Sequence, residues 1–305
     1  MTTSYAFHTL DVFTDTIFGG NPLAVLTDAR GLDSEQMARL TREFNLSETV
    51  FVLPPEDPKY ARSVRIFTPG RELPFAGHPT VGTAFLLAAL GMIPLTDGDT
   101  KIVLGEGVGP VPVTIRIENG APVSAELTAA QAPEFRDDVP GAAELASLLS
   151  ISIVDLAGGD FHPRAVSCGV PFLLVPLASR DAVARAKMDN AVWERLLSNA
   201  WASEVYLFDA SAAQTGAPIR ARMYAPALGI GEDPATGSAA ACLAAYLASH
   251  TSGPVEGRWT VEQGFEMGRR SVLQIAATRT DGRTGNVRVG GRAVLVTQGT
   301  IRVGN

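Results

Sequence analysis

Residues 79–90 decide how this chain folds, and they read Pro79-Thr80-Val81-Gly82-Thr83-Ala84-Phe85-Leu86-Leu87-Ala88-Ala89-Leu90. Apolar or small side chains occupy every face of the helix predicted here, so that helix must be buried on all sides. A second stretch, residues 234–248, has the same character and begins with Pro234-Ala235-Thr236-Gly237-Ser238-Ala239. We therefore expect two central helices, each enclosed by strands.

These two stretches belong to a repeat that runs along the chain. The segment 79–84 matches 234–239 at an offset of 155 residues, and Glu48 matches Glu204 at 156. The run 65–69 matches 222–226 at 157, as Glu106-Gly107 matches Gln263-Gly264. Matches in the same order at almost the same offset predict a duplicated domain. A single domain with chance similarities is the alternative.

The coarse pattern within each half is α+β. Short apolar strands and amphipathic helices alternate, and no linker separates the halves; the join should lie between Asn119 and Ala142. Helical periodicity and strand alternation predict helices at 34–44 and 189–200 and strands at 49–53, 205–209, 111–117 and 292–303.

Composition restricts the possible functions of the 305 residues. With 25 basic and 32 acidic residues, the net charge is −7, which argues against binding to nucleic acid. The longest apolar run, 84–95, is too short to span a membrane, and residues 1–15 do not resemble a secretory signal. Two cysteines form no disulfide framework, so we expect a soluble cytoplasmic protein.

The starts of the two central helices carry the first candidate site residues. His78-Pro79 and Asp233-Pro234 each place a polar residue before a proline, which favours the first position of a helix. The N–H groups of a helix start attract anions, so two such starts facing one cleft would hold a carboxylate. Alternatively, Asp233 is an ordinary helix cap and His78 an ordinary loop residue.

Glu48 is the third candidate, at the entry to an apolar strand. Neighbouring apolar side chains would raise the pKa of its carboxyl group, which suits a general acid/base. The matching Glu204 favours a structural role at this position instead, such as a cap or an ion pair. The residues alone leave both interpretations open.

Taken together, several segments resemble the PhzF family of phenazine-biosynthesis isomerase-like proteins, which share the diaminopimelate epimerase fold. The resemblance covers nearly the whole chain in order. It rests on the segments 13–15, 18–25, 45–51, 65–69, 72–80, 231–239, 263–264 and 268–269.

This resemblance implies two pseudo-symmetric domains, each a curved, mostly antiparallel, barrel-like sheet around a central helix. We expect an N-terminal domain of residues 1–125 plus about 295–305 and a C-terminal domain of residues 126–294, with the active site in the cleft between them. The family also implies a homodimer, and a small carboxylate as the substrate.

The resemblance further implies roles for individual residues. Glu48 would transfer the proton, with His78 and Asp233 flanking the substrate as catalytic residues. We expect Gly77, Gly237, Ser238 and Asn21 to bind the substrate. The sequence shows no metal-ligand spacing among its histidines, and the glycines 105, 107 and 109 precede prolines rather than a helix, so we expect no metal and no cofactor.

The cysteines help to choose the reaction. Epimerases of this fold use two thiols, at the positions of His78 and Asp233, whereas Cys168 and Cys242 lie elsewhere and look like small buried residues. An isomerase that moves one proton within its substrate is therefore the favoured function. A racemase or epimerase with other bases, and a ligand- or protein-binding module without turnover, remain the alternatives.

Overall fold

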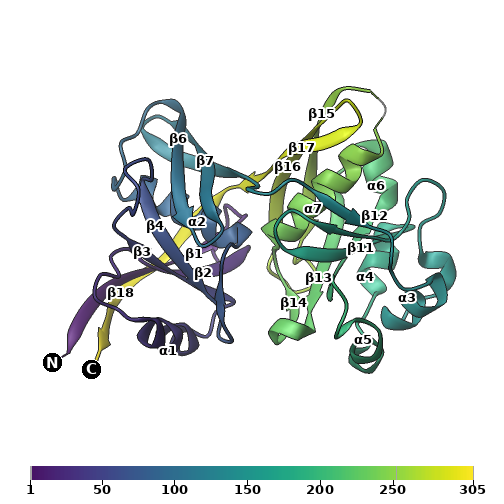
Figure 1. The fold of residues 1–305 in the computed structure, drawn as a ribbon, viewed down its shortest axis with the longest axis horizontal. Coiled ribbons are helices and arrows are strands. Elements are labelled where there is room, and N and C mark those ends of the chain that lie inside the picture. The colour runs from purple at the N-terminus through teal and green to yellow at the C-terminus, as the bar shows by residue number, and fades with distance from the viewer. Residues whose placement is uncertain (1, 252, 305) are drawn as a thin grey trace. The chain divides into compact units, whose positions relative to one another are not determined.

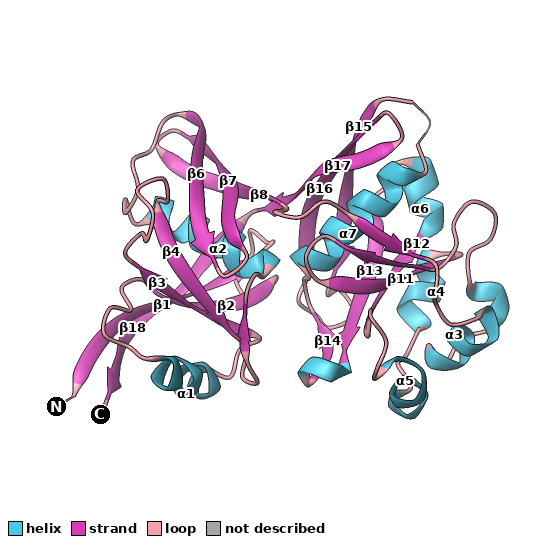
Figure 2. Ribbon diagram, viewed as in Figure 1, coloured by secondary structure: helices cyan, strands magenta, loops and turns pink. Residues whose placement is uncertain are grey.

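The structure is a computed structural model that describes residues 2–251 and 253–304. The chain divides into two compact units (Figures 1 and 2). Unit 1 comprises Met1–Ala130 and Gly290–Asn305, and unit 2 comprises Gln131–Val289. The sequence predicts these boundaries near residues 125 and 295. Both units mix helices with a dominant share of strands, so the predicted α+β class is confirmed.

Unit 1 is a mostly antiparallel sheet with two parallel pairs, β2–β3 and β4–β6. The antiparallel neighbours are β18–β1, β1–β2, β3–β4, β4–β5, β6–β7 and β7–β8. The elements are β1 (Thr3–Val12), β2 (Asn21–Leu26), α1 (Ser34–Phe44), β3 (Glu48–Leu53), β4 (Arg62–Phe67), β5 (Glu72–Leu73), α2 (Gly77–Ala89), β6 (Gly98–Glu106), β7 (Gly109–Glu118), β8 (Ala121–Thr128) and β18 (Ala293–Val303).

Unit 2 has the same order of pairing, with parallel pairs β11–β12 and β13–β15. The antiparallel neighbours are β9–β10, β10–β11, β12–β13, β13–β14 and β15–β16. The elements are β9 (Glu134–Arg136), α3 (Ala142–Leu148), η1 (Ile153–Asp155), β10 (Arg164–Ser167), β11 (Pro171–Leu177), α4 (Arg180–Arg185), α5 (Asn190–Leu197), β12 (Glu204–Asp209), α6 (Ala210–Thr215), β13 (Ile219–Ala225), η2 (Pro226–Leu228), β14 (Ile230–Asp233), α7 (Gly237–Ser249), β15 (Val255–Gln263), β16 (Ser271–Thr280) and β17 (Arg283–Gly291).

The strand register shows the same offset as the sequence. In unit 1, β4 pairs with β6 through Arg62↔Leu104, and in unit 2, β13 pairs with β15 through Ile219↔Val261. Both partners of the second pair lie 157 residues beyond those of the first. The units thus share one topology, and duplication of an ancestral domain is our interpretation of it.

The central helices α2 and α7 have no polar face, as the sequence predicted. Every residue of α2 from Gly77 to Ala88 is buried, and all of α7 is buried from Ala239 to Ala248. Strands surround each helix within its own unit (Figure 2). Each of these two helices has 13 residues, and in the described part of the chain no helix is both long and apolar enough to span a membrane.

The predicted starts of both central helices are wrong. Helix α2 begins at Gly77, so Pro79 is its third residue, still in the first turn where its missing N–H has no helical partner. Helix α7 begins only at Gly237, because Asp233 is still part of strand β14 and pairs with Met223 of β13. Asp233 is therefore not a helix cap.

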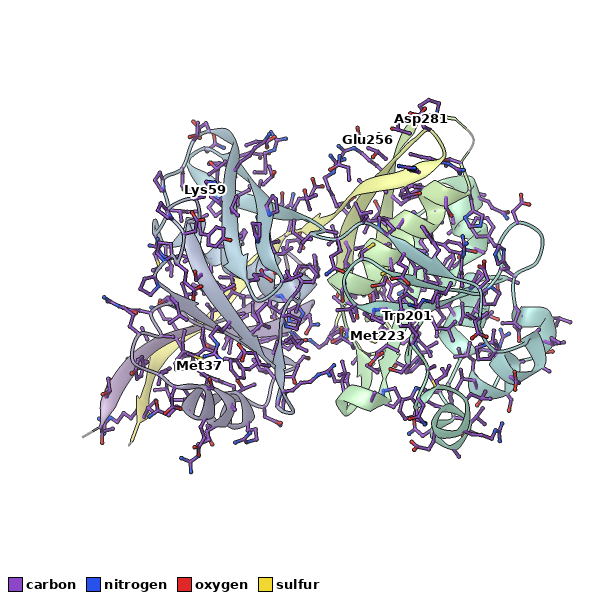
Figure 3. The ribbon with its side chains drawn as sticks, in the orientation of Figure 1. Met37, Lys59, Trp201, Met223, Glu256 and Asp281 are labelled. Atoms are coloured by element: carbon purple, nitrogen blue, oxygen red, sulfur yellow. The ribbon has the colours of Figure 1, made fainter. Side chains whose placement is uncertain are left out.

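Helix α1 covers one face of the unit 1 sheet and matches its prediction. Asp33 caps it and forms a capping box with Gln36, and Asn45 ends it in the left-handed conformation. Met37, labelled in Figure 3, is on the buried face and packs into a cluster with Phe51 and other apolar residues of the sheet. This packing fixes the start of β3, where Glu48 lies.

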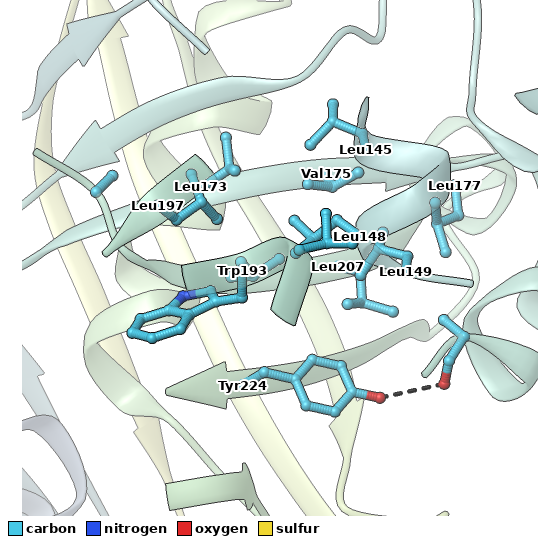
Figure 4. Packing of buried hydrophobic residues seen from close by; sticks show 14 of the residues in the cluster. Leu145, Leu148, Leu149, Leu173, Val175, Leu177, Trp193, Leu197, Leu207 and Tyr224 are labelled. Atoms are coloured by element: carbon cyan, nitrogen blue, oxygen red, sulfur yellow. Dashed lines mark hydrogen bonds between the residues drawn. The ribbon is translucent and has the colours of Figure 1, made fainter. Parts of the chain in front are cut away.

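Unit 2 has a second apolar layer outside its sheet, formed by α3, α4 and α5 (Figure 4). Trp193 of α5 and Leu148 of α3 pack against strand residues such as Leu207. The hydroxyl of Tyr224 donates a hydrogen bond to the Ala186 carbonyl across this layer, at 3.2 Å. The layer leaves the other face of the sheet for α7.

Because α2 is enclosed on all sides, truncating its core side chains should destabilise the fold. We expect Leu86→Ala to lower the free energy of unfolding by about 3 kcal/mol, since Leu86 is fully buried. Leu90 is 38% exposed at the end of the same helix, so Leu90→Ala should cost less than about 1 kcal/mol. Urea unfolding measures both; equal losses would contradict the enclosed position of α2.

Candidate active site

In unit 1, three predicted site residues from separate elements lie together. Glu48 is the first residue of β3, His78 the second of α2 and Asn21 the first of β2. The Nε2 atom of His78 lies 3.4 Å from Oε2 of Glu48, and its Nδ1 atom lies 3.3 Å from Nδ2 of Asn21. The side chains of His78 and Glu48 are only 5% and 12% exposed. The pairing of β2 with β3 and the enclosure of α2 bring these three side chains together.

His78 is neutral, so its contact with Glu48 is not an ion pair. Burial lowers the pKa of His78 to about 3, against a small opposing effect from a hydrogen bond with the Pro22 carbonyl. A neutral imidazole carries its proton on one nitrogen, and either tautomer is compatible with the contacts at Nδ1. At Nε2, the ring can therefore either donate a proton toward Glu48 or accept one from it.

Gly77 stands at the open start of α2, next to His78. The residue before it, Ala76, is the N-cap and has no side chain that could cap the helix. First-turn N–H groups lack partners within a helix, so they are suited to bind an anion from outside. The absence of a side chain on Gly77 leaves its own N–H group accessible.

In unit 2, Asp233 is held by a network of buried hydrogen bonds. Its Oδ2 atom accepts a hydrogen bond from the Thr236 hydroxyl at 2.5 Å. Gln263 donates from Nε2 to the Asp233 carbonyl at 2.8 Å and to Thr236 Oγ1 at 3.0 Å. Its Oε1 atom accepts from the Thr236 N–H group and from the hydroxyl of Tyr206. Burial, followed by the Asp233 charge, raises the pKa of Tyr206, so this hydroxyl stays protonated.

This network leaves the start of α7 without its usual cap. Thr236 is the N-cap residue, and a threonine there ordinarily accepts a hydrogen bond from the first turn. Here its hydroxyl donates to Asp233 instead, and no side-chain cap forms. The first residues of α7, Gly237 and Ser238, thus form a second helix start of the same kind as Gly77-His78.

Several residues at these two helix starts were not predicted as site residues. Thr80 and Glu106 belong to the α2 start, and Thr236, Gln263 and Tyr206 to the α7 start. The sequence did contain a signal, because Glu106-Gly107 and Gln263-Gly264 match in the repeat. Hydrophobic patterning does not explain why polar residues are buried at matching positions of the two units. These matching positions were therefore the signal by which Glu106 and Gln263 could have been found.

The cysteines and the glycine run lie elsewhere. Cys168 and Cys242 are both buried free thiols of unit 2, and Cys242 is the sixth residue of α7 rather than at its start. Gly105 lies near the end of β6, Gly107 in the tight turn after it and Gly109 at the start of β7, so a strand and not a helix follows them. They do not form a dinucleotide-binding turn.

Fold and site together define a protein class: two strand-rich units of one topology, each with an apolar central helix whose uncapped start lies among buried polar groups. A solved structure described as a predicted epimerase of Pseudomonas aeruginosa has this fold. It superposes with a TM-score of 0.79 at 33% identity, covering 97% of this chain and 99% of that one.

Residues 10–299 match the family PhzC-PhzF, described as phenazine biosynthesis-like protein, and the chain belongs to this family. An uncharacterized isomerase of Mesorhizobium japonicum is 38% identical, covering 95% of this chain and 96% of the relative. A trans-2,3-dihydro-3-hydroxyanthranilate isomerase of Pseudomonas fluorescens is 37% identical, covering 96% and 97%. The predicted family is therefore confirmed, and the protein is an isomerase-type enzyme of it.

The neutral state of His78 predicts a pH dependence of stability. Its folded-state pKa of about 3 lies below the 6.5 of an unfolded histidine, so the unfolded chain alone gains a proton between these values. The free energy of unfolding should therefore fall with decreasing pH, by about 2 kcal/mol from this residue between pH 7 and pH 5. Urea titrations of the wild type and His78→Asn at both pH values measure it; an equal fall in both proteins would contradict a neutral His78.

Proposed function

We propose that the protein is a cofactor-independent isomerase that moves a proton within a small unsaturated carboxylate, with Glu48 as the general acid/base. The observation that supports this most is the buried pair of Glu48 and neutral His78, 3.4 Å apart. Because His78 is neutral at the outset, no imidazolium has to form before a proton passes between His78 and Glu48.

In the proposed reaction, the Glu48 carboxylate removes a proton from a carbon that is acidic because it is conjugated to the carboxylate system. The electron pair moves along the conjugated bonds, so the double bond shifts. Glu48 then returns the proton to another carbon and regains its initial state. The reaction is balanced without metal, oxidant or cofactor, and His78 assists by exchanging a proton with Glu48 at Nε2.

Each helix start has a proposed role in binding. We assign the substrate carboxylate to the first-turn N–H groups of Gly77 and of Gly237-Ser238, where helix dipoles favour an anion. Asn21 orients His78 and contacts the substrate, and Asp233 is the acidic group on the side of unit 2. The homodimer that the family resemblance implies is part of this proposal.

The first substrate to test follows from the relatives. A protein 37% identical is named for isomerising trans-2,3-dihydro-3-hydroxyanthranilate, a ring carboxylate with conjugated double bonds. Such a compound has an acidic C–H bond and a carboxylate, the two features that the proposed site uses. We propose a substrate of this type, in the cytoplasm.

Epimerisation is the second candidate, because a related structure at 33% identity is described as a predicted epimerase. Running the reaction in D₂O separates the two functions by NMR. An isomerase yields a product with a shifted double bond, whose new C–H bond carries the transferred proton, or deuterium where the Glu48 carboxyl group has exchanged with solvent. An epimerase leaves the double bonds in place and yields the stereoisomer of the substrate with deuterium at the inverted centre.

The role of Glu48 can be tested against a matched residue in the repeat. Glu48→Gln should lower kcat for trans-2,3-dihydro-3-hydroxyanthranilate by about 10²–10⁴-fold, because it removes the general acid/base. Glu204 occupies the corresponding start of β12 and accepts a hydrogen bond from Ser203, so Glu204→Gln should change kcat much less. Circular dichroism verifies the fold of both variants. Full activity of Glu48→Gln would show that another residue is the base.

A further inference from the structure

Glu106 is a buried carboxyl group that the proposed reaction does not use. It ends strand β6, and its residue is only 9% exposed. Its Oε1 atom lies 2.6 Å from the hydroxyl oxygen of Thr80, the fourth residue of α2. Isolated charges in such a place are unfavourable, so its protonation state matters for the fold.

The hydrogen bonds of Thr80 determine where the proton must be. Its hydroxyl lies 2.7 Å from the carbonyl oxygen of Ala76 and 2.6 Å from Glu106. A hydroxyl has one proton, and a carbonyl oxygen can only accept, so the proton of Thr80 points at Ala76. The second short contact then joins two oxygens, and it is favourable only if Glu106 supplies the proton.

The surroundings of Glu106 agree with a neutral acid. Gly109 lies opposite it in the β6–β7 hairpin, and the α2 side chain in contact with its carboxyl group is the neutral Thr80. The segment 74–76, which contacts the hairpin through Gly107, has no charged side chain. Burial, the largest cause, raises the pKa of Glu106 to about 8.

The backbone of α2 connects the Glu106–Thr80 contact to the candidate active site. Ala76 is the N-cap residue of α2, and its carbonyl also accepts the N–H group of Thr80. The residues that follow it are Gly77 and His78. Fixing the Ala76 carbonyl therefore fixes the backbone from which His78 approaches Glu48.

Unit 2 has a neutral side chain at the corresponding position. Gln263 lies 157 residues beyond Glu106, ends β15 and bridges Asp233 and Thr236 before α7. The glycine that follows has the same role in both units: a Cβ at Gly107 would lie 2.9 Å from Pro74, and one at Gly264 would lie 2.5 Å from the Pro234 carbonyl. Each unit thus fixes its helix start with a neutral donor.

We propose that Glu106 is held as a neutral carboxylic acid which donates to Thr80 and acts as a positioning residue for His78. The chain of donors runs from Glu106 to Thr80 and from Thr80 to the Ala76 carbonyl. Only the importance of His78 for turnover rests on the proposed function; the protonation state and the link do not.

Infrared spectroscopy tests the protonation state without any substrate. The difference spectrum of wild type minus Glu106→Gln should contain, at pH 7, the carbonyl band of a protonated carboxylic acid, above the amide I band. The band should disappear as the pH passes about 8. No such band at pH 7 would overturn the proposal.

The link to His78 is tested by the imidazole ¹⁵N NMR signals. Glu106→Leu and Thr80→Val should both shift them, because each removes the same chain of hydrogen bonds, and the double variant should show no further shift. Glu106→Gln should leave them in place, since an amide donates as Gln263 does. Unchanged signals in Thr80→Val, or equal shifts in Glu106→Gln and Glu106→Leu, would overturn the proposal, whatever the activity of Glu48→Gln.

The same variants give a measurable change in stability. Between about pH 4.5 and pH 8, the folded state keeps a proton on Glu106 that the unfolded chain has lost. The contribution of Glu106 to wild-type stability should therefore fall with rising pH in this window, opposite in sign to that of His78, and Glu106→Gln should lack it. The Tm of Glu106→Gln relative to the wild type should rise from pH 5 to pH 8; a constant difference would contradict a neutral Glu106.

Discussion

The structure depends on two helices that have no polar face. Because apolar side chains surround α2 and α7, each must be covered on every side, and strands of its own unit do this. The backbone polar groups of a helix are satisfied internally except at its ends. Enclosing such a helix therefore concentrates N–H groups without helical partners at one place in each unit. Several buried polar residues lie at these places: His78, Thr80 and Glu106 in unit 1, and Asp233, Thr236 and Gln263 in unit 2.

At each helix start the usual cap is missing. Ala76 has no capping side chain, and the hydroxyl of Thr236 donates to Asp233 rather than accepting from α7. Omitting a cap costs about 1 kcal/mol of stability for each helix. Stability lost in this way is typical of functional sites, where the open groups serve a ligand. The placement of Glu48 and His78 beside one of these starts is consistent with that role.

Much of the fold followed from the sequence because it depends on periodicity. The bounds of α1, the apolar character of α2 and α7, and the position of Glu48 at the start of a strand were all predicted from local patterns. The helix starts were not, because strand pairing competes with helix formation: Asp233 pairs with Met223, which delays α7 until Gly237. Local sequence patterns do not show whether strand pairing or helix formation prevails at such a residue.

The chemistry was harder to predict than the fold. The meeting of Glu48, His78 and Asn21 depends on the parallel pairing of β2 with β3, which brings residues of distant segments together. The neutral state of His78 depends on burial, which only the folded structure gives. Gln263 and Glu106 stood out in the repeat, yet their partners, Thr236 and Thr80, became visible only in three dimensions.

The most direct test of the central claim is a crystal structure with an unreactive carboxylate analogue of trans-2,3-dihydro-3-hydroxyanthranilate. The account predicts that the carboxylate accepts hydrogen bonds from first-turn N–H groups at the helix starts, those of Gly77 or those of Gly237 and Ser238. The ring carbon that loses the proton should lie within reach of Glu48. An analogue bound away from both helix starts, or with Glu48 turned away from it, would contradict the account.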